Sequence, residues 1–337
     1  MTGQLIMAFV VAFFLSSGVG AFLVPWLRRI KVGQSIREDG PTWHRSKAGT
    51  PTMGGIMFIL AVIVVCLSIG YPLMLAGEYG HIFCLFFALI YGAIGFLDDV
   101  EKLRKRQNLG LTAKKKFLLQ LVAAIAFLFL LRRFGYLTPN LYIPFWNETI
   151  PVSEPLYFIF AAFVMVGTVN AVNITDGVDG LATGTSLPVF LCYTAVATAW
   201  GETYLGLGIF SAAVTGALLG FLLFNFFPAK VFMGDTGSLF LGGAVCSVAF
   251  AMDMPLILVT LGVVYIVETL SDIIQVGYFK LTGGKRVFRM APLHHHLEMG
   301  GWSGKKWSEK EIFVLFTMIS AVFAVASFLG VFTRYSY

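Results

Sequence analysis

Ten apolar stretches, most of them close to the length of a membrane-spanning helix, dominate this sequence of 337 residues. They lie at residues 5–27, 53–73, 79–97, 117–131, 155–170, 180–199, 205–227, 236–252, 255–279 and 311–333. About 20 helical residues cross the roughly 30 Å hydrocarbon core of a bilayer. Because 58% of the residues are hydrophobic and only 12% are charged, a water-soluble core could not bury this much apolar surface. The pattern predicts an all-α integral membrane protein with about ten transmembrane helices.

Lysine and arginine are concentrated on alternate loops of this pattern. Of the 24 basic residues, 21 fall in the loops at residues 28–52, 98–116, 228–235 and 280–310. Short cytoplasmic loops carry the positive excess in membrane proteins, so these loops are predicted to be cytoplasmic and both termini periplasmic. The first apolar stretch is longer than the apolar core of a secretory signal and is kept as a membrane helix. We interpret residues 1–337 as a single polytopic membrane domain.

Segments outside the apolar stretches and the basic loops add three smaller expectations. Residues 136–152 alternate apolar and polar side chains around Pro139 and Asn140, which predicts a small periplasmic β-hairpin. The four cysteines lie inside predicted membrane helices without a CxxC pair, so they indicate neither disulfides nor a metal site. No basic helix interleaved with aromatic residues occurs, which argues against nucleic acid as a partner.

Acidic residues gather at predicted helix ends on the cytoplasmic face. Asp98 and Asp99 follow the third apolar stretch directly. Adjacent helical residues point about 100° apart, so we expect these carboxylates to meet different partners, one of them a lysine and the other a metal or a nucleophile. The alternative is that the pair merely ends a membrane helix in water, where acids cost little.

Two further acidic groups adjoin other helix ends. Asp176 and Asp179 lie three residues apart and share one side of a helical turn, where a cation or hydrogen-bond donors on a ligand would relieve their repulsion. The alternative is a solvated turn. Asp235 lies at the start of a predicted helix, where unpaired N–H groups favour an anion. Alternatively, Asp235 or Ser238 is a simple N-cap.

Histidines and intramembrane polar residues occur near the C-terminal end. His294, His295 and His296 follow Pro292 in a basic loop. Consecutive side chains diverge too far to bind one zinc ion readily, so we favour contacts to an anion and hydrogen-bonding support. In the predicted helix 255–279, Glu268, Asp272 and Gln275 share one face. An ionisable residue at a membrane centre costs roughly 2.5–3.5 kcal/mol, so this face is expected to line a wet cleft or to bond to other helices.

Together these groups predict one polar site at the cytoplasmic membrane surface. Mg²⁺ is bound through one or two carboxylates together with substrate phosphates, and Lys47, Lys102 and Lys116 would hold a polyanionic substrate. This set suits phosphoryl transfer, which depends on positioning and charge neutralisation. The sequence contains no P-loop, G-x-S-x-G or H-E-x-x-H motif, which argues against P-loop ATP hydrolysis, serine hydrolases and zinc proteases. A secondary transporter is the second class considered, but transporter sites lie near the midplane between internal repeats.

Five motifs carry a resemblance to a known family. They are KAGTPTMGG (47–55), GFLDDVEKL (95–103), NAVNITDGVDGLATG (170–184), FNFFPAKVFMGDTGSLFLGG (224–243) and GGKRVFRMAPLHHHLE (283–298). Together they resemble the phospho-N-acetylmuramoyl-pentapeptide transferases, the MraY translocases of the polyprenyl-phosphate phosphosugar transferase superfamily. The motifs extend over most of the chain.

The resemblance implies a ten-helix enzyme of the bacterial inner membrane, with its active site on the cytoplasmic face, and a homodimer. It also implies a reaction that moves phospho-MurNAc-pentapeptide from its UDP carrier to undecaprenyl phosphate with Mg²⁺, forming lipid I and UMP in peptidoglycan synthesis. The reaction would proceed by direct attack or through a covalent aspartyl intermediate. A GlcNAc-1-phosphate transferase acting on the same lipid is the alternative within the superfamily.

By the same resemblance, individual residues receive expected roles. Asp98, Asp99 and Asp235 match catalytic aspartates, with Asp235 as the magnesium ligand and Asp98 as the group that activates the lipid phosphate. The remaining matches are substrate-binding positions: Lys47, Lys116, Asn173, Asp176, Asp179, Phe232, His294, His295 and His296. The helix at 255–279 is expected to form one wall of a groove for the prenyl tail.

Overall fold

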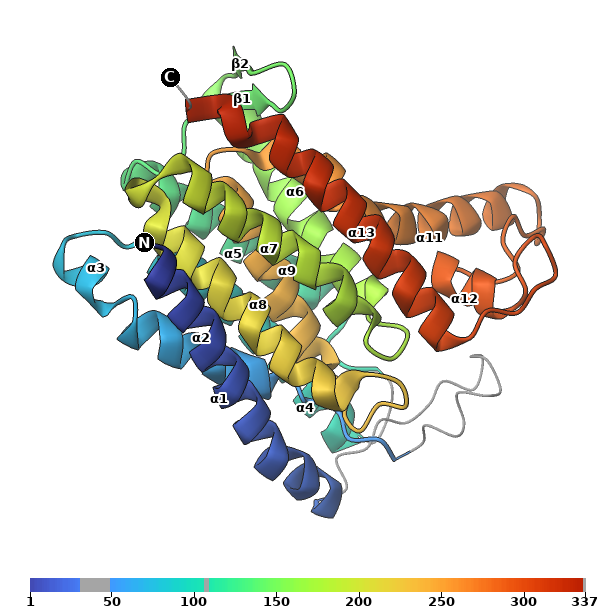
Figure 1. Cartoon of the computed structure of the whole chain (residues 1–337). Coiled ribbons are helices and arrows are strands. Elements are labelled where there is room, and N and C mark those ends of the chain that lie inside the picture. The colour runs from blue at the N-terminus through green and yellow to red at the C-terminus, as the bar shows by residue number, and fades with distance from the viewer. Residues whose placement is uncertain (31–48, 106–108, 336–337) are drawn as a thin grey trace.

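The computed structural model describes residues 1–30, 49–105 and 109–335, and these form a bundle of helices with one small hairpin (Figure 1). The α-helices are α1 (Thr2–Arg29), α2 (Ile56–Ser68), α3 (Tyr71–Leu75), α4 (Gly80–Lys105), α5 (Ala113–Arg133), α6 (Glu154–Thr175), α7 (Leu181–Trp200), α8 (Leu205–Asn225), α9 (Gly234–Ala251), α10 (Leu258–Leu261), α11 (Val263–Leu281), α12 (Leu293–Glu298) and α13 (Glu309–Val331). The short 3-10 helices are η2 (Glu202–Tyr204), η3 (Pro255–Ile257) and η4 (Phe332–Tyr335). The all-α prediction is confirmed.

Each of the ten predicted apolar stretches is largely helical, but the number of candidate membrane spans is smaller than ten. Seven helical segments of the described chain are long and apolar enough to cross a membrane. The segments Pro255–Leu261 and Val263–Leu281 make an eighth if the pair, which is bent by 79°, counts as one span. Helix α2 has 13 residues, about 20 Å of helix, and α5 carries lysines and arginines at its two ends. These two helices account for the difference.

Glycines let the central helices approach closely. On α8, a Cβ atom added at Gly216 would collide with the backbone oxygen of Phe9 on α1, and one at Gly220 would lie 2.6 Å from the backbone oxygen of Phe13. On α4, a Cβ atom at Gly95 would collide with the backbone of Asp235 at the start of α9. Small residues at such crossings are typical of membrane helix pairs, which associate through packing instead of the hydrophobic effect. The α4–α9 crossing places the two ends that carry Asp98, Asp99 and Asp235 side by side.

Both ends of the described chain lie at the end of the bundle opposite to these aspartates. Helices α1 and α8 run parallel, because Leu5 packs at Gly208 near the start of α8 and the Arg28 side chain donates to the Lys230 carbonyl beyond its end. The Tyr335 ring lies 5.7 Å from the ring of Tyr204, just before α8. The fold thus agrees with a topology in which the two termini share one side of the membrane.

The predicted hairpin is present. Strands β1 (Asn140–Ile143) and β2 (Glu148–Pro151) pair antiparallel, with Asn140 opposite Pro151 and Ile143 opposite Glu148. Positive φ angles at Phe145 and Asn147 reverse the chain between the strands. The Phe145 N–H donates to the Gly330 carbonyl near the end of α13 at 2.8 Å, and Figure 1 shows the hairpin beside that end. The four cysteines are free and buried.

Candidate active site

The carboxylates of Asp98 and Asp235 meet at one lysine. Asp98 lies near the C-terminal end of α4 and Asp235 in the first turn of α9. The Lys102 Nζ atom, one turn beyond Asp98 on α4, lies 2.7 Å from Asp98 Oδ2 and 3.0 Å from Asp235 Oδ2. Lys116 Nζ, near the start of α5, approaches the same Asp235 oxygen at 2.7 Å. Two carboxylates and two ammonium groups therefore form one compact charged cluster, whose charges compensate each other at short range.

Asn173 joins this cluster from α6. Its Nδ2 donates to Asp235 Oδ1 at 3.1 Å and to Ser238 Oγ at 2.6 Å. One turn earlier on α6, Asn170 Nδ2 donates to Gln120 Oε1 on α5 at 2.7 Å. Four helices therefore contribute to the site at the same end of the bundle: α4, α5, α6 and α9.

Asp99 has partners quite different from those of Asp98. Its Oδ1 accepts the backbone N–H of Asp235 at 3.1 Å, and its Oδ2 accepts the backbone N–H and the hydroxyl of Thr236 at 2.9 and 2.7 Å. Asp99 therefore caps the N-terminus of α9 from another helix, where a negative charge complements the helix dipole. The first turn of α9 is capped by neither Asp235 nor Ser238. The two adjacent aspartates meet different partners, as expected, and the lysine belongs to Asp98. The other expected partner was a metal or a nucleophile, but the oxygens of Asp99 bind the start of α9.

The NITDGVDG turn connects several loops. Asp176 ends α6, half-buried. Asp179 is buried; its Oδ2 accepts the Ala229 N–H at 2.8 Å, and its own N–H donates to Glu309 Oε2 at 3.1 Å. Asp179 thereby joins the turn to the loop before α9 and to the start of α13, which is more than a solvated turn requires.

Phe232 lies on the same loop as Ala229 and pairs with the chain before α2. Its N–H donates to the Pro51 carbonyl at 2.8 Å, and its carbonyl accepts the Gly54 N–H at 2.8 Å. Lys47, which was predicted to contact the substrate from this segment, lies outside the described residues. The structure thus brings the 49–55 segment against the loop that carries Phe232.

The three consecutive histidines have three different environments. His294 Nδ1 lies 2.8 Å from Glu268 Oε2 on α11, and both side chains are buried. His295 Nδ1 lies 2.7 Å from Glu298 Oε2. His296 Nδ1 accepts the Arg289 N–H at 3.1 Å. The divergence expected for consecutive side chains is confirmed, and among residues 1–30, 49–105 and 109–335 no three His, Cys, Asp or Glu side chains form a metal ligand set.

Charge affects the first and third histidines in opposite directions. Burial alone would lower the pKa of His294, but the Glu268 carboxylate, with Glu298 and Asp272 further away, raises that pKa above its usual value. Burial and the Arg289 guanidinium lower the pKa of His296. Of these two histidines, His294 is the one whose surroundings favour the charged form.

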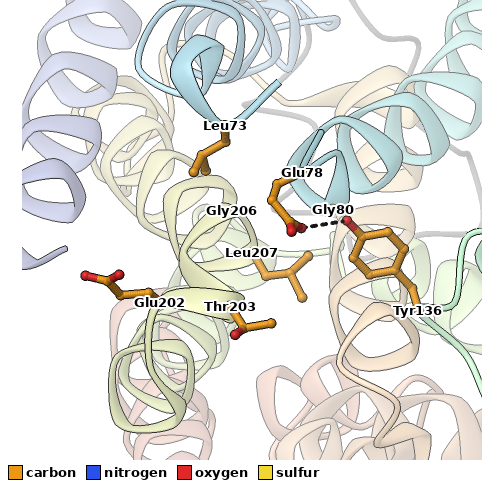
Figure 2. A pocket seen from close by; sticks show the side chains of 8 residues that line it. All are labelled: Leu73, Glu78, Gly80, Tyr136, Glu202, Thr203, Gly206 and Leu207. Atoms are coloured by element: carbon orange, nitrogen blue, oxygen red, sulfur yellow. Dashed lines mark hydrogen bonds between the residues drawn. The ribbon is translucent and has the colours of Figure 1, made fainter. Parts of the chain in front are cut away.

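A small cavity of about 20 Å³ lies away from all these residues. It is lined by Leu73, Glu78, Gly80, Tyr136, Glu202, Thr203, Gly206 and Leu207. Figure 2 shows the Glu78 carboxylate turned toward the Tyr136 hydroxyl, 3.4 Å away, whereas the Glu202 carboxylate points elsewhere. Its walls lie at the beginnings of α4 and α8, at the opposite end of the bundle from Asp98, so this cavity is not part of the candidate active site.

Some residues of the site were not fully anticipated from the sequence. Lys102 was expected only as a phosphate contact, yet it bridges two carboxylates. The sequence did indicate its contact with Asp98, because residues four apart on a helix lie on the same face. Thr236, which binds Asp99, and Glu268, which binds His294, have partners that are 137 and 26 residues away. No local pattern identifies such pairs.

The sequence is similar to those of known membrane transferases. The profile of "Glycosyl transferase family 4" matches residues 81–253, and "Phospho-N-acetylmuramoyl-pentapeptide-transferase signature 1" matches residues 47–59. A phospho-N-acetylmuramoyl-pentapeptide-transferase of Geobacillus thermodenitrificans is 46% identical over 95% of this chain and 96% of its own length. Proteins of the same name from Listeria monocytogenes and Oceanobacillus iheyensis are 43% and 44% identical, covering 96% and 98% of this chain and 97% and 98% of their own lengths.

The helical bundle, its charged cluster and the matched profile define a multi-pass bacterial membrane transferase of glycosyl transferase family 4. Within that class, two findings point to one family. The signature at residues 47–59 and the relatives that match nearly the whole chain all carry the name phospho-N-acetylmuramoyl-pentapeptide-transferase. The chain belongs to the phospho-N-acetylmuramoyl-pentapeptide transferase family.

Proposed function

We propose that this protein transfers phospho-MurNAc-pentapeptide from its UDP carrier to undecaprenyl phosphate, forming lipid I and UMP for peptidoglycan synthesis. The observation that carries the proposal is the cluster in which Lys102 and Lys116 meet the carboxylates of Asp98 and Asp235. Both substrates bring phosphate groups to a membrane surface. An ammonium group that binds a carboxylate can bind a phosphate oxygen in its place, because both acceptors are anionic and form charge-assisted hydrogen bonds with lysine.

The donor set of this cluster fits Mg²⁺. The ion takes oxygen ligands, usually one or two carboxylates together with waters and substrate phosphates. Asp98 and Asp235 already converge on one positive charge, that of Lys102, whereas the oxygens of Asp99 bind the start of α9. Asp235 is therefore the proposed ligand, with Asp98 beside it. When bound, the ion would neutralise charge on the diphosphate.

The protein's own groups have distinct proposed roles. Asp98 activates the phosphate of the lipid acceptor. Asn173 orients Asp235 through their hydrogen bond. Lys116 contacts a substrate phosphate. Asp99, the third predicted catalytic aspartate, holds the first turn of α9 in place, and this turn carries Asp235.

The remaining predicted residues are proposed to bind the nucleotide sugar. Lys47, Asp179 and Phe232 belong to the uridine side, and the hydrogen bonds that join the Phe232 loop to the chain at Pro51 and to Asp179 support a common location. Asp176 lies one turn beyond Asn173 and would face the sugar phosphate. His294, His295 and His296 are proposed to bind the substrate from α12.

The lipid substrate and the membrane arrangement complete the proposal. Helix α11 leans away from the bundle (Figure 1) and exposes apolar side chains such as Ile273 and Leu281, which are 61% and 88% accessible. This face would form a wall of the prenyl groove. We further propose that the site faces the cytoplasm, that both termini are periplasmic, that ten helices cross the membrane and that the protein is a homodimer, as the family resemblance implies.

UMP release tests the reaction directly. Purified protein is incubated with Mg²⁺, undecaprenyl phosphate and either UDP-MurNAc-pentapeptide or UDP-GlcNAc. UMP is expected only with the muramoyl nucleotide. Turnover of UDP-GlcNAc alone would indicate the GlcNAc-1-phosphate transferase, and solute uptake by proteoliposomes without UMP release would indicate a transporter. Mass measurement of the protein in lipid nanodiscs tests the dimer.

A further inference from the structure

The buried pair of His294 and Glu268 is held by two elements that do not contribute to the charged cluster. Glu268 lies on α11 and is fully buried, and His294 lies in the first turn of the short helix α12 with 1% of its side chain accessible. The Nδ1–Oε2 distance of 2.8 Å identifies a hydrogen bond in which the carboxylate accepts. A carboxylate opposite Nδ1 fixes which nitrogen carries a hydrogen and which way the ring faces.

The second ring nitrogen of His294 is the informative atom. Nε2 is buried and has no hydrogen-bond partner in the described structure. Buried polar atoms of this kind are rare in native proteins because each unmade hydrogen bond is costly. A Cβ atom added at Gly177 would collide with Nε2, so this atom lies directly against the NITDGVDG turn.

That turn is connected to the charged cluster through α6. Gly177 follows Asp176 at the end of the helix and lies one helical turn beyond Asn173, which binds Asp235. The absence of a side chain at Gly177 lets the imidazole approach the backbone. His294 Nε2 therefore lies beside the segment that carries two of the proposed substrate-binding residues.

The charges around His294 are mostly negative. Glu268 and Asp272 approach from α11, Glu298 acts from α12, and Asp176 belongs to the adjoining turn. His295 is a further titratable neighbour, and its ring centroid is 4.2 Å from that of His294. These acids favour an imidazolium, in which both nitrogens are donors, so Nε2 would present an N–H to an acceptor.

We propose that Glu268 is a positioning residue that holds His294 with its Nε2–H directed at the Asp176–Gly177 turn, where it donates a hydrogen bond to an anionic oxygen of the nucleotide-sugar substrate. This inference rests on the proposed function and adds a residue from α11 to it. Glu268 does not touch the substrate; it acts through the orientation and charge of His294.

Glu268→Gln tests the inference, because glutamine keeps the shape and an acceptor oxygen but removes the charge. We expect kcat/KM for UDP-MurNAc-pentapeptide to fall about tenfold or more, the size of one hydrogen bond to a charged group. The alkaline limb of its pH profile should move to lower pH, while the variant remains folded in detergent. Glu268→Asp should restore part of the activity. In a His294→Ala background, Glu268→Gln should change kcat/KM less than about twofold, since residues that act as a unit are not additive.

A matched control makes the same chemical change at the neighbouring pair. In Glu298→Gln, which alters the partner of His295, the midpoint of the alkaline limb should move less than in Glu268→Gln, because Glu268 has the larger effect on the pKa of His294. An unchanged pH profile in Glu268→Gln, or an undiminished effect in the His294→Ala background, would overturn the inference.

A second measurement separates this inference from the proposed function. Nitrogen-15 NMR of protein labelled at histidine reports the titration of His294 without substrate, with the signal assigned through His294→Ala. The signal should titrate at lower pH in Glu268→Gln than in the parent. If the parent releases no UMP with any nucleotide sugar but this shift is seen, the proposed function fails while the Glu268–His294 coupling stands; if UMP is released and no shift is seen, the inference fails alone.

Discussion

The carboxylate of Asp99 binds both the backbone N–H and the hydroxyl of Thr236, 137 residues further along the chain. Through this contact, the end of α4 caps the start of α9. The same turn carries Asp235, so the contact determines where the proposed magnesium ligand lies. A buried aspartate can therefore matter for activity by supporting a neighbour's position.

Asp99→Ala should lower both stability and activity. Loss of a helix cap costs about 0.5–2 kcal/mol, and the donors left unpaired at Asp235 and Thr236 add to that cost. We expect a lower thermal unfolding temperature in detergent and a large loss of UMP release. Thermal unfolding monitored by tryptophan fluorescence measures the first effect. Parental stability in this variant would contradict the capping role.

Asp235→Ala should abolish UMP release while the protein remains folded. The change removes the proposed Mg²⁺ ligand and the partner of Lys116, and a loss of at least about a hundredfold is expected for a group that stabilises developing charge. Asp98→Asn should be equally severe. Asp253→Asn serves as a control, because Asp253 binds Thr138 and Arg334 at the other end of the bundle. Near-normal Mg²⁺-dependent turnover in Asp235→Ala would refute its assignment.

Lys102→Met should make the protein more dependent on Mg²⁺ for stability. Without the ammonium group, the carboxylates of Asp98 and Asp235 lose a shared cation and repel each other. A bound divalent ion would replace the missing charge, and a ligand that binds only the folded state raises its stability. Unfolding temperatures measured in Mg²⁺ and in EDTA should therefore differ more in this variant than in the parent. An equal difference in both proteins would argue against a metal at this position.

The contributions of His294 and His296 to stability should depend on pH with opposite signs. The folded-state pKa of His294 is raised by Glu268, so its contribution is fully present below its unfolded pKa of about 6.5 and is lost as the pH rises through the folded value. The folded-state pKa of His296 is lowered, so its contribution is present above about 6.5 and is lost as the pH falls.

Unfolding temperatures of the parent, His294→Gln and His296→Gln between about pH 5 and 9 measure both trends. The difference between parent and His294→Gln should shrink as the pH rises, whereas the difference between parent and His296→Gln should grow. Parallel trends in the two variants would contradict the assignment of the charged form to His294.

Gly177→Ala should reduce activity by displacing His294. The added methyl group would collide with Nε2 of the imidazole, and small misplacements at an active site cost up to about a hundredfold. Gly167→Ala, on the helix α6 that precedes this turn, is the control, because a Cβ atom there meets nothing within 4 Å. The measurement is UMP release by the two variants under identical conditions. Equal activity would show that the contact between Gly177 and His294 does not affect the reaction.

Much of the fold was predictable because its signals are local. Apolar runs predicted where helices lie, and alternation around residues 136–152 predicted the hairpin that the structure contains. The number of candidate membrane spans differs from the predicted number. Helix α2 is short and α5 has charged ends, so neither is among the helices of the described chain that are long and apolar enough to cross a membrane.

The sequence by itself determined that the chain is a helical membrane protein, which family it belongs to, and that carboxylates, lysines and an amide occur at helix ends. Only the tertiary structure decided what each group does: Asp98 shares Lys102 with Asp235, Asp99 caps α9, and Glu268 holds His294. The physical reason is range. Hydropathy and motif spacing act along the chain, whereas these contacts join distant segments that approach closely at glycines such as Gly95 on α4 and Gly177 in the turn after α6.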